Sequence, residues 1–446
     1  MFSFSLFKSM LLERAVLPLA DFISGQNVME YYHFFDESQW WSPEDLYAYQ
    51  MKSLKNLLRI SSEEVPFYQE YFKRYGVNVE SIKNRSDLSQ IPPVRKKDLR
   101  QAYPDKCVRK TQYPFQEFHT SGSTGIPFVA RLDVPTLSEA RALMLLRAKF
   151  SGWSFGESML QTGMSLQRGQ TKRLKDLLLS VKYVSAFDLS DIKLDQYLNV
   201  IDKKKLCFVM GYPGSIYFLA KRAQEVGFNR KLKGIVCWGD NLYEHYRRTI
   251  EQAFGCKITD TYGCGEGIQV AAQCQMGSYH VFMPHVIVEI VDENGLSVAP
   301  GATGSVLLTR LSPGPMPLIR YYVGDIAKKS SNGRCSCRRS LETFEAIEGR
   351  DTDIIVTPRG NRLIVHFFTG IFEYYTSIET FKVTQEEVDR IHVEIVPKAD
   401  FTPKHWEMIK KEILEKGDPN LEISMSLVDD IPYEASNKRR FVVSKI

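Results

Sequence analysis

The residues from Phe118 to Val129 read FHTSGSTGIPFV, and seven of these twelve are Gly, Ser, Thr or Pro. Successive backbone N–H groups of a glycine-rich turn can converge on one anion, and hydroxyl side chains add donors. The loop carries no positive charge and no Gly-Lys-Ser/Thr follows it, so it is not a Walker phosphate loop. Taken alone, this composition more often marks an ordinary turn. Two interpretations stay open here: a phosphate-binding loop and a simple bend.

A second set of residues that could do chemistry contains three thiols and one imidazole: Cys274, His280, Cys335 and Cys337. Zinc binds such ligands tetrahedrally, and a closed set of four is structural rather than catalytic. The spacing lacks the paired Cys-x-x-Cys knuckles typical of zinc-binding sequences. The alternative is three unrelated reduced thiols and a surface histidine. Without a secretory signal, we expect the eight cysteines of the chain to be reduced or metal-bound rather than disulfide-bonded.

Length and composition limit the class of protein. With 446 residues the chain is too long for one hydrophobic core, so we expect at least two domains. Its 43% hydrophobic and 25% charged residues are typical of globular proteins. The net charge of +5 is mild and the C-terminal NKRRFVVSK is a local basic cluster, so nucleic acid binding is not expected. No run of 18 or more apolar residues occurs, so no membrane-spanning segment is expected either.

The N-terminal stretch MFSFSLFKSMLLERAVLPLADFISG is rich in apolar residues but is interrupted by Lys8, Glu13 and Arg14. No small-residue cleavage site follows a clean apolar run, so we expect no signal peptide and a cytoplasmic protein. The pattern is typical of an amphipathic helix. We favour a helix docked on the protein's own surface. Peripheral contact with a membrane surface is the alternative.

Local patterns predict the elements that must position these residues. The sequence from Ser42 to Asp45 is typical of a helix start, and apolar residues from Met51 to Leu58 then recur at helical spacing. A second helix is predicted from Glu139 to Phe150. From about Leu206, strand-like and helical runs alternate: LCFVMGYP, GSIYFLAKRAQEVG, KGIVCWGD, LYEHYRRTIEQAFG and CKITDTYG. This alternation predicts βαβ units and a parallel sheet.

The pattern changes at about His280. Two close-spaced β segments follow, with Asn294-Gly295 as a hairpin signal, and predict a small antiparallel subdomain. From about residue 350 the chain restarts with DIIVTPRGNRLIV, then HVEIV, the helical PKHWEMIKKEILEKG and EISMSLV. We therefore expect an α/β protein with a large N-terminal domain over residues 1–349 and a small α+β domain over residues 350–446.

Five short motifs occur in order: TSGSTGIP (Thr120 to Pro127), YGCGE (Tyr262 to Glu266), YYVGD (Tyr321 to Asp325), GRDTD (Gly349 to Asp353) and NKRR (Asn437 to Arg440). Together they resemble the adenylate-forming superfamily of acyl-CoA synthetases, peptide-synthetase adenylation domains and luciferases. Within it the chain is most similar to the phenylacetate–CoA ligase branch, which includes capsular-polysaccharide CapK-like proteins. The resemblance runs from about Ser42 to the C-terminus. It implies an N-terminal domain that binds ATP and a carboxylate, and a mobile C-terminal lid.

The resemblance also assigns roles in binding ATP and Mg²⁺. The residues that would hold the β- and γ-phosphates are Ser121, Gly122, Ser123, Thr124 and Gly125. The residues that would surround adenine are Tyr262, Gly263, Gly239 and Asp240. Asp325 would accept both ribose hydroxyls, as a carboxylate can, with Arg350 beside it at the hinge between the domains. Glu266 would hold Mg²⁺, a hard cation that takes oxygen ligands. Considered singly, an Asp after Gly is usually a turn residue and a lone Glu is usually solvated.

Lys438 is the catalytic residue that the resemblance implies. In this superfamily a lysine near the C-terminus reaches the α-phosphate and the attacking carboxylate, where a preorganised ammonium stabilises the transition state. The alternative is a solvated basic tail, because Arg439, Arg440 and Lys445 make this tail basic in any case. Relatives often carry Gly where this chain has Asn437, so the register could be one residue off.

Two further positions depart from the family pattern. Gly265 stands where many superfamily members have Thr, which removes one hydroxyl from the phosphate site. The branch also has a comparable Cys…His…Cys-x-Cys pattern, but commonly with Gly at the position of Arg338, which leaves the local turn open.

The sequence thus predicts an ATP-dependent, AMP-forming ligase. A small carboxylic acid would become an acyl-adenylate and would then be transferred to coenzyme A. Two alternatives stay open: transfer to an amine, giving an amide in polysaccharide or secondary-metabolite assembly, and a nucleotide-binding protein that has lost catalysis. The acid pocket is expected around Phe118–His119, Gly211–Pro213 and Trp238, and these residues suit a modest, partly apolar acid without naming it.

Overall fold

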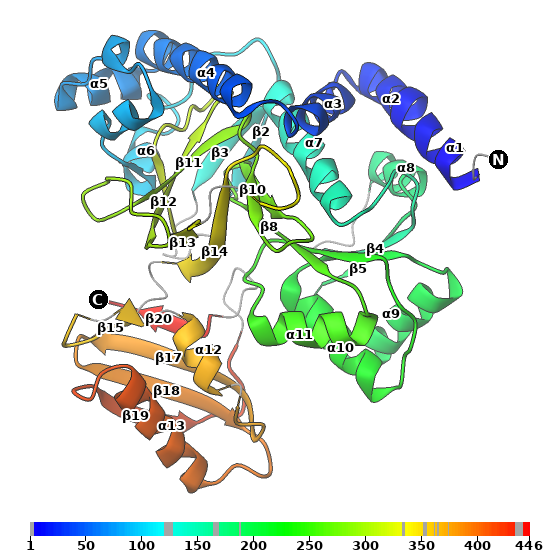
Figure 1. Cartoon of the computed structure of the whole chain (residues 1–446), viewed down its shortest axis with the longest axis vertical. Coiled ribbons are helices and arrows are strands. Elements are labelled where there is room, and N and C mark those ends of the chain that lie inside the picture. Colours follow the sequence, from blue (N-terminus) through cyan, green and yellow to red (C-terminus); the bar gives the residue numbers. More distant parts are fainter. Residues whose placement is uncertain are drawn as a thin grey trace. The chain divides into compact units, whose positions relative to one another are not determined.

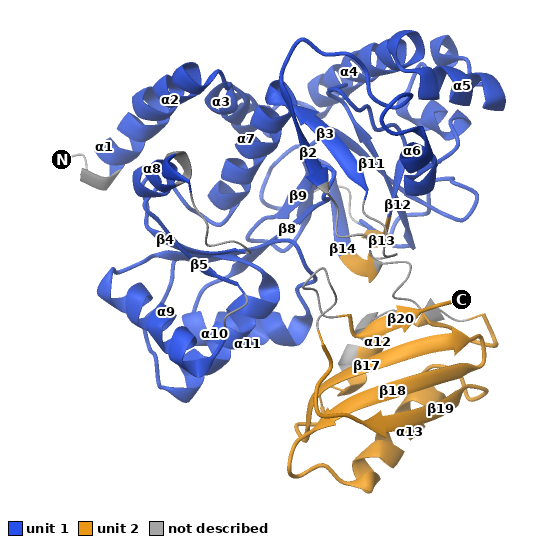
Figure 2. Ribbon diagram, turned by 180° about the vertical axis from the view of Figure 1, so that it is seen from behind, with its two compact units in different colours: residues 1–120, 127–323, 329–346 blue, residues 121–126, 324–328, 347–446 orange. Residues whose placement is uncertain are grey.

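The computed structural model describes residues 4–119, 128–163, 169–186, 189–331, 335–350, 355–360, 362–363, 365–372, 374–432 and 440–446. The chain forms two compact units, labelled by element in Figure 1 and coloured by unit in Figure 2. Unit 1 comprises residues 1–120, 127–323 and 329–346, and unit 2 comprises residues 121–126, 324–328 and 347–446.

A twelve-stranded sheet runs through unit 1, in the order β11-β12-β13-β14-β10-β9-β8-β7-β6-β4-β5, with β1 paired to β13. Its strands are β1 (Val94–Arg95), β4 (Met159–Gly163), β5 (Val181–Ser185), β6 (Phe208–Gly211), β7 (Gly234–Cys237), β8 (Ile258–Gly263), β9 (Gln269–Gln273), β10 (Tyr279–Val281), β11 (Val286–Val291), β12 (Thr303–Arg310), β13 (Tyr321–Lys329) and β14 (Thr343–Arg350). A separate hairpin pairs β2 (Phe115–His119) with β3 (Val129–Asp133).

The sheet has a parallel half and an antiparallel half. Strands β5, β4, β6, β7 and β8 are parallel neighbours, with α10 (Pro213–Glu225) after β6 and α11 (Glu244–Phe254) after β7, which confirms the predicted βαβ units. The pairs β8–β9, β9–β10, β10–β14 and β11–β12 are antiparallel. The antiparallel strands predicted after His280 therefore extend the parallel sheet, and the strand direction changes at β8.

The other helices of unit 1 are α1 (Phe4–Leu11), a π-helical turn (Leu12–Val16), α2 (Leu17–Ser24), α3 (Val28–Ser38), α4 (Pro43–Glu64), α5 (Pro66–Tyr75), α6 (Lys96–Ala102), α7 (Val134–Phe150), α8 (Gln170–Leu178) and α9 (Asp191–Lys203), with 3₁₀ turns at Val79–Ser81 and Arg85–Gln90. The predicted start of α4 is confirmed, because the Asp45 N–H donates to Ser42 Oγ at 3.0 Å. Helix α7 begins five residues before the prediction, where Asp133 Oδ1 accepts the Thr136 N–H at 3.1 Å and caps the helix. No helix in the described part of the chain is long and apolar enough to cross a membrane.

The core of unit 1 lies where α7 contacts α3 and strands β8 and β9. Its large buried side chains include Phe35, Leu143, Phe150, Trp153 and Phe208. Helix α7 is buried along most of its length, so its sequence lacks a clear polar face.

Unit 2 contains a four-stranded sheet in the order β19-β18-β17-β20, formed by β17 (Ile378–Glu387), β18 (Arg390–Pro397), β19 (Glu422–Leu427) and β20 (Val442–Ser444). Its helices are α12 (Val365–Phe372) and α13 (Pro403–Lys416), and a small hairpin pairs β15 (Ile355–Val356) with β16 (Arg362–Leu363). Trp406, Ile409 and Ile413 of α13 are buried, as their spacing predicts. Unit 2 is thus the α+β structure expected for the C-terminal part.

Candidate active site

The carboxyl ends of β6, β7 and β8 carry several of the predicted site residues. In open α/β sheets, ligands bind at the carboxyl ends of parallel strands, where the strand order or direction changes. Gly211 ends β6, Trp238 follows β7, and Tyr262 and Gly263 end β8. The Trp238 N–H donates to the Gly211 carbonyl at 3.1 Å, so the ends of β6 and β7 stay paired up to this point. The structure therefore brings these predicted residues to one edge of the sheet.

Gly239 adopts a backbone conformation that only glycine takes without strain. Its φ is +81°, and a Cβ atom at this position would lie 2.8 Å from Cε1 of Tyr212. The turn after β7 therefore brings bare backbone to the sheet edge. The next residue, Asp240, is half-buried, and its Oδ1 accepts the Asn241 N–H at 2.9 Å. This turn is where the adenine pocket is predicted.

Aromatic rings pack beside the end of β8. Tyr262 is 9% exposed and lies edge-on to Phe344, with 6.1 Å between ring centroids. Phe344 in turn stacks on Tyr279 at 4.8 Å. At Gly263 a Cβ would lie 2.8 Å from the Ile268 carbonyl oxygen, so no side chain fits there. The end of β8 thus combines a fixed aromatic ring with exposed backbone.

Glu266 follows β8 and is 2% exposed. Its Oε1 accepts the Tyr321 hydroxyl at 2.6 Å and lies 3.1 Å from the Lys96 ammonium. Burial alone would raise the pKa of Glu266, but the Lys96 charge and the Tyr321 hydrogen bond outweigh it, so the pKa lies below its ordinary value. Glu266 is therefore an ionised carboxylate at neutral pH, held in a fixed position.

The sequence analysis missed Lys96 and Tyr321. Lys96 is the first residue of α6, where no motif marks it, and its Nζ lies 5.8 Å from the ring centroid of Phe128. Phe128 directly follows the predicted phosphate loop, so this lysine lies near the end of that loop. Tyr321 is the first residue of the YYVGD motif, in which the sequence predicted a role for Asp325 alone.

Arg147 is a buried cation that also escaped the sequence analysis. Its guanidinium carbon lies 4.7 Å from the ring centroid of Trp238, and its Nη1 donates to Gln269 Oε1 at 3.1 Å. Burial lowers the pKa of Arg147 to about 10, so the side chain stays charged at neutral pH. Arg147, hydrogen-bonded to Gln269, therefore packs on the Trp238 ring at the predicted acid pocket.

The structure describes some of the other predicted residues and leaves out the rest. Asp325 is half-buried in β13, and Arg350 ends β14, where its side chain is not described. Strands β2 and β3 pair as far as His119 and Val129, and the predicted phosphate loop lies between these two residues in the sequence. The predicted residues outside the described ranges are Ser121, Gly122, Ser123, Thr124, Gly125 and Lys438.

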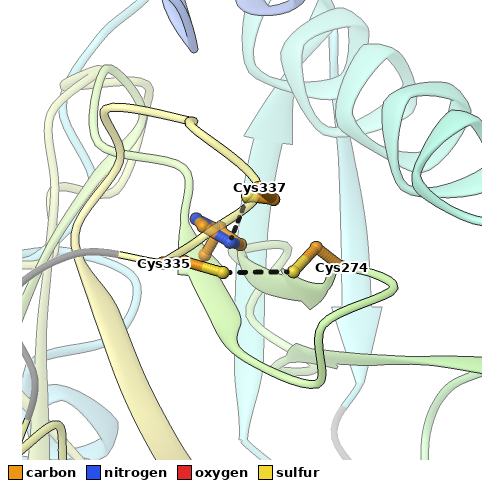
Figure 3. A group of neighbouring side chains, drawn as sticks. Cys274, Cys335 and Cys337 are labelled. Carbon is orange, nitrogen blue, oxygen red and sulfur yellow. Dashed lines mark hydrogen bonds between the residues drawn. The ribbon is translucent and has the colours of Figure 1, made fainter.

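The predicted zinc ligands lie together in unit 1 (Figure 3). The ligand atoms of Cys274, His280, Cys335 and Cys337 all lie within 4.8 Å of one another. Cys274 Sγ is 3.6 Å from Cys335 Sγ, and Cys337 Sγ is 3.2 Å from His280 Nε2. Bonds of 2.0–2.3 Å to a tetrahedral zinc ion would place such ligand atoms about 3.5–3.8 Å apart. Burial, helped by the Arg339 charge, lowers the pKa of His280 to about 4, so the ring is neutral at pH 7, as a metal ligand must be.

The turn after Cys337 forms although glycine is absent from it. Arg338 has a φ of +68°, in the left-handed region that glycine favours, and its N–H donates to the Cys335 carbonyl at 3.2 Å. Arg338 therefore adopts the strained conformation itself. The thiols of Cys335 and Cys337 still lie in the cluster.

Comparison with known proteins gives two family matches. Residues 181–316 match the family described as AMP-binding enzyme, and residues 355–445 match the CapK C-terminal domain. The first range contains Gly239, Asp240, Tyr262 and Glu266, and the second contains position 438.

Two relatives and one solved structure, each aligned over most of its length, extend these matches. The phenylacetate–coenzyme A ligase of Thermus thermophilus is 26% identical over 414 residues, which cover 89% of this chain and 87% of the relative. That of Aromatoleum evansii is 24% identical over 400 residues, covering 83% and 87%. The structure of a 2-hydroxyisobutyryl-CoA ligase in its postadenylation state aligns with a TM-score of 0.70 at 20% identity and covers 89% of both chains, which shows a shared fold.

Proposed function

We propose that this chain, which belongs to the adenylate-forming superfamily in its phenylacetate–CoA ligase-like branch, uses ATP to activate a carboxylic acid and transfers the acyl group to coenzyme A. The observation that carries the proposal is Glu266: a buried, ionised carboxylate fixed by Lys96 and Tyr321 just after β8, where the sheet changes direction. Such a carboxylate is the oxygen ligand that a hard cation beside a polyphosphate requires.

In the first step an oxygen of the acid's carboxylate attacks the α-phosphorus of ATP. The bond from that phosphorus to the bridging oxygen breaks, and pyrophosphate leaves. Glu266 would hold Mg²⁺, which neutralises phosphate charge when it is bound. Lys96, next to Glu266 and near the end of the phosphate loop, would bind the departing pyrophosphate. Lys438 would stabilise the charge that builds up at the α-phosphate.

The remaining predicted residues would position the nucleotide. Asp325 would accept both ribose hydroxyls, with Arg350 beside it, and the turn at Gly239 and Asp240 would line the adenine pocket with Tyr262 and Gly263. The phosphates would bind to the loop residues Ser121, Gly122, Ser123, Thr124 and Gly125. The domain over residues 350–446 would act as the mobile lid.

In the second step the sulfur of coenzyme A attacks the acyl carbonyl, and the bond to AMP breaks. An amine acceptor would release AMP in the same way and form an amide, as in polysaccharide assembly. ATP as substrate, together with eight free cysteines, favours a cytoplasmic location.

We further propose that Cys274, His280, Cys335 and Cys337 bind one structural Zn²⁺. Their distances suit a tetrahedral ion, and thiolate and imidazole are its preferred ligands. Four protein ligands leave no open position, so the ion would stabilise the fold and would take no part in the reaction.

Pyrophosphate exchange across a panel of carboxylic acids tests the proposed activity. We expect wild-type protein to exchange pyrophosphate into ATP with one class of acid, and Glu266→Gln to lose two to three orders of magnitude in rate, about the loss caused by removing one preorganised electrostatic group. Glu80→Gln, an exposed site, is the matched control. Coenzyme A and amines are then supplied separately to identify the acceptor. No exchange with any acid would favour the non-catalytic nucleotide-binding protein.

A further inference from the structure

The N-terminal helical segment, residues 4–24, exposes many of its apolar side chains to solvent. This segment consists of α1, the π-helical turn and α2, and a surface helix normally turns its apolar side toward the core. Here the side chains that face the protein include polar ones. Lys8 Nζ donates to the Gly156 carbonyl and to Ser180 Oγ, both at 3.1 Å, and Asp21 Oδ2 accepts the Met29 N–H at 2.6 Å. Leu12 is buried, and Val16 and Leu17 pack half-buried against the core.

Helix α8 continues this apolar surface. Its C-terminal end is next to α1, because Ser180 accepts from Lys8. Burial raises the pKa of Asp21, and Lys175 of α8 is close enough for its charge to oppose this rise in part. Figure 1 shows α8 beside α1 and α2 in unit 1. The two segments expose nine large apolar side chains: Leu6, Phe7, Met10, Leu11, Leu19, Phe22, Ile23, Leu174 and Leu177. We call these nine residues the apolar ridge.

The ridge is more exposed than isolated surface residues usually are. Phe22 is 84% exposed, Ile23 77% and Leu177 75%. Scattered single apolar residues on a surface need no explanation, but nine exposed ones on neighbouring helices indicate an interaction site. Phe22 and Ile23 lie on α2 and Leu177 lies on α8, and exposed side chains on surface helices suit insertion into a membrane interface.

The exposed charges beside the ridge favour one kind of partner. The exposed charged residues on the described parts of the two segments are all basic: Arg14, Arg173 and Lys175. The acidic residues Glu13, Asp21 and Asp176 are only partly exposed. An apolar helix face flanked by exposed basic residues has the chemistry of a segment that lies in the interface of an anionic bilayer.

We propose that the apolar ridge binds the surface of a membrane that contains anionic lipids, with residues 4–24 lying in the plane of the interface. Apolar side chains would enter the boundary between headgroups and acyl chains, and Arg14, Arg173 and Lys175 would contact lipid phosphates. This binding would hold the enzyme beside a membrane without a spanning helix. It does not depend on the proposed reaction.

Co-sedimentation with vesicles tests the proposal. Wild-type protein is mixed with vesicles of phosphatidylcholine alone or with one-third phosphatidylglycerol. We expect binding to the anionic vesicles and much weaker binding to the neutral ones. Phe22→Asp/Ile23→Asp should lower the bound fraction at least about tenfold, because burial of each native side chain is worth more than a factor of ten. Arg173→Glu/Lys175→Glu should remove the preference for anionic lipid.

Ile192→Asp is the matched control, because Ile192 is 71% exposed on α9 and lies outside the ridge, so this variant should bind like wild type. Light scattering measures the mass of wild type and of Phe22→Asp/Ile23→Asp, and we expect the same mass for both. The proposal is overturned if wild type binds neither vesicle, or if the double variant binds as well as wild type. It is also overturned if wild type is a dimer that the double variant dissociates, since a second copy would then cover the ridge.

Discussion

At the scale of single residues, the site depends on one carboxylate and the cation beside it. Glu266 is buried, and its ionised state depends on Lys96 and Tyr321. A buried carboxylate without these partners would take up a proton near neutral pH. The same geometry therefore makes the charge of Glu266 dependent on Lys96, a residue outside every motif.

Lys96→Met should change the pH dependence of adenylation. Loss of the ammonium lets burial dominate and raises the pKa of Glu266. Because the protonated acid cannot hold Mg²⁺, activity should disappear as pH falls through this raised pKa, at a higher pH than in wild type. The measurement is kcat/KM for pyrophosphate exchange from pH 5 to 9. Lys97→Met, on the exposed neighbouring side chain, should leave the profile unchanged, and an unshifted profile in Lys96→Met would refute the coupling.

Lys438→Ala should separate the two steps of the reaction. ATP binding should stay nearly intact, while acyl-adenylate formation should slow by roughly two to three orders of magnitude. When pre-made acyl-adenylate is supplied, the variant should still transfer the acyl group, because in this superfamily the lysine moves away for the second step. Single-turnover assays of each step give the measurement. If Arg439→Ala loses adenylation and Lys438→Ala does not, the assigned register is wrong.

At the scale of elements, short turns bring functional groups to the sheet edge. The turn after β7 requires Gly239 in a left-handed conformation, and the β9–β10 hairpin places Cys274 near His280. Both turns are also constrained by packing, because Cys274 is buried in the core of unit 1 and Gly239 lies against the Tyr212 ring.

Gly239→Ala should weaken both the fold and nucleotide binding. Its Cβ would meet the Tyr212 ring at 2.8 Å, and the left-handed backbone costs about 1–3 kcal/mol for other residues. Chemical denaturation and ATP affinity measure the two effects. Gly214→Ala in α10 is the control, because its Cβ would meet nothing within 4 Å, and it should be neutral or slightly stabilising. Equal behaviour of the two variants would mean that the turn is not constrained.

Purified protein should contain about one zinc ion per chain. Cys335→Ser or Cys337→Ser should lower the metal content and the unfolding temperature, since ligand binding to the native state stabilises it. Cys207→Ser, away from the cluster, should do neither. Metal analysis that finds no zinc in protein prepared without chelator would refute the site, and wild-type stability in Cys335→Ser would exclude a structural role.

At the scale of the whole molecule, the chain has two compact units, and the predicted nucleotide residues occur in both. ATP with Mg²⁺ at about a hundred times its Kd should raise the free energy of unfolding by about 2.7 kcal/mol. Asp325→Ala should abolish most of this gain, because hydrogen bonds to a charged acceptor are each worth about 1.5–3 kcal/mol. Thermal unfolding with and without nucleotide measures this gain in stability. Asp400→Ala, on an exposed turn, should keep the full gain, and a normal gain in Asp325→Ala would show that the ribose site is misplaced.

The sequence alone determined the features that depend on neighbours along the chain. The βαβ alternation, the start of α4 and the buried face of α13 are all encoded within one or two elements, where periodicity and capping residues act locally. The ordered motifs likewise indicated the family, because each one is a short stretch with its own backbone requirement.

Only the tertiary structure decided which distant groups meet. Tyr321 contacts Glu266 across 55 residues of sequence and Lys96 contacts it from the other direction, yet no local pattern links them. The tertiary structure also decided which side chains of the N-terminal helices are exposed. The apolar pattern of residues 4–24 predicts an amphipathic helix. In the structure Leu12 is buried, Lys8 and Asp21 make hydrogen bonds to the rest of unit 1, and seven large apolar side chains stay exposed. A periodic pattern defines the faces of a helix, and the packing of the rest of the chain determines which face is left uncovered.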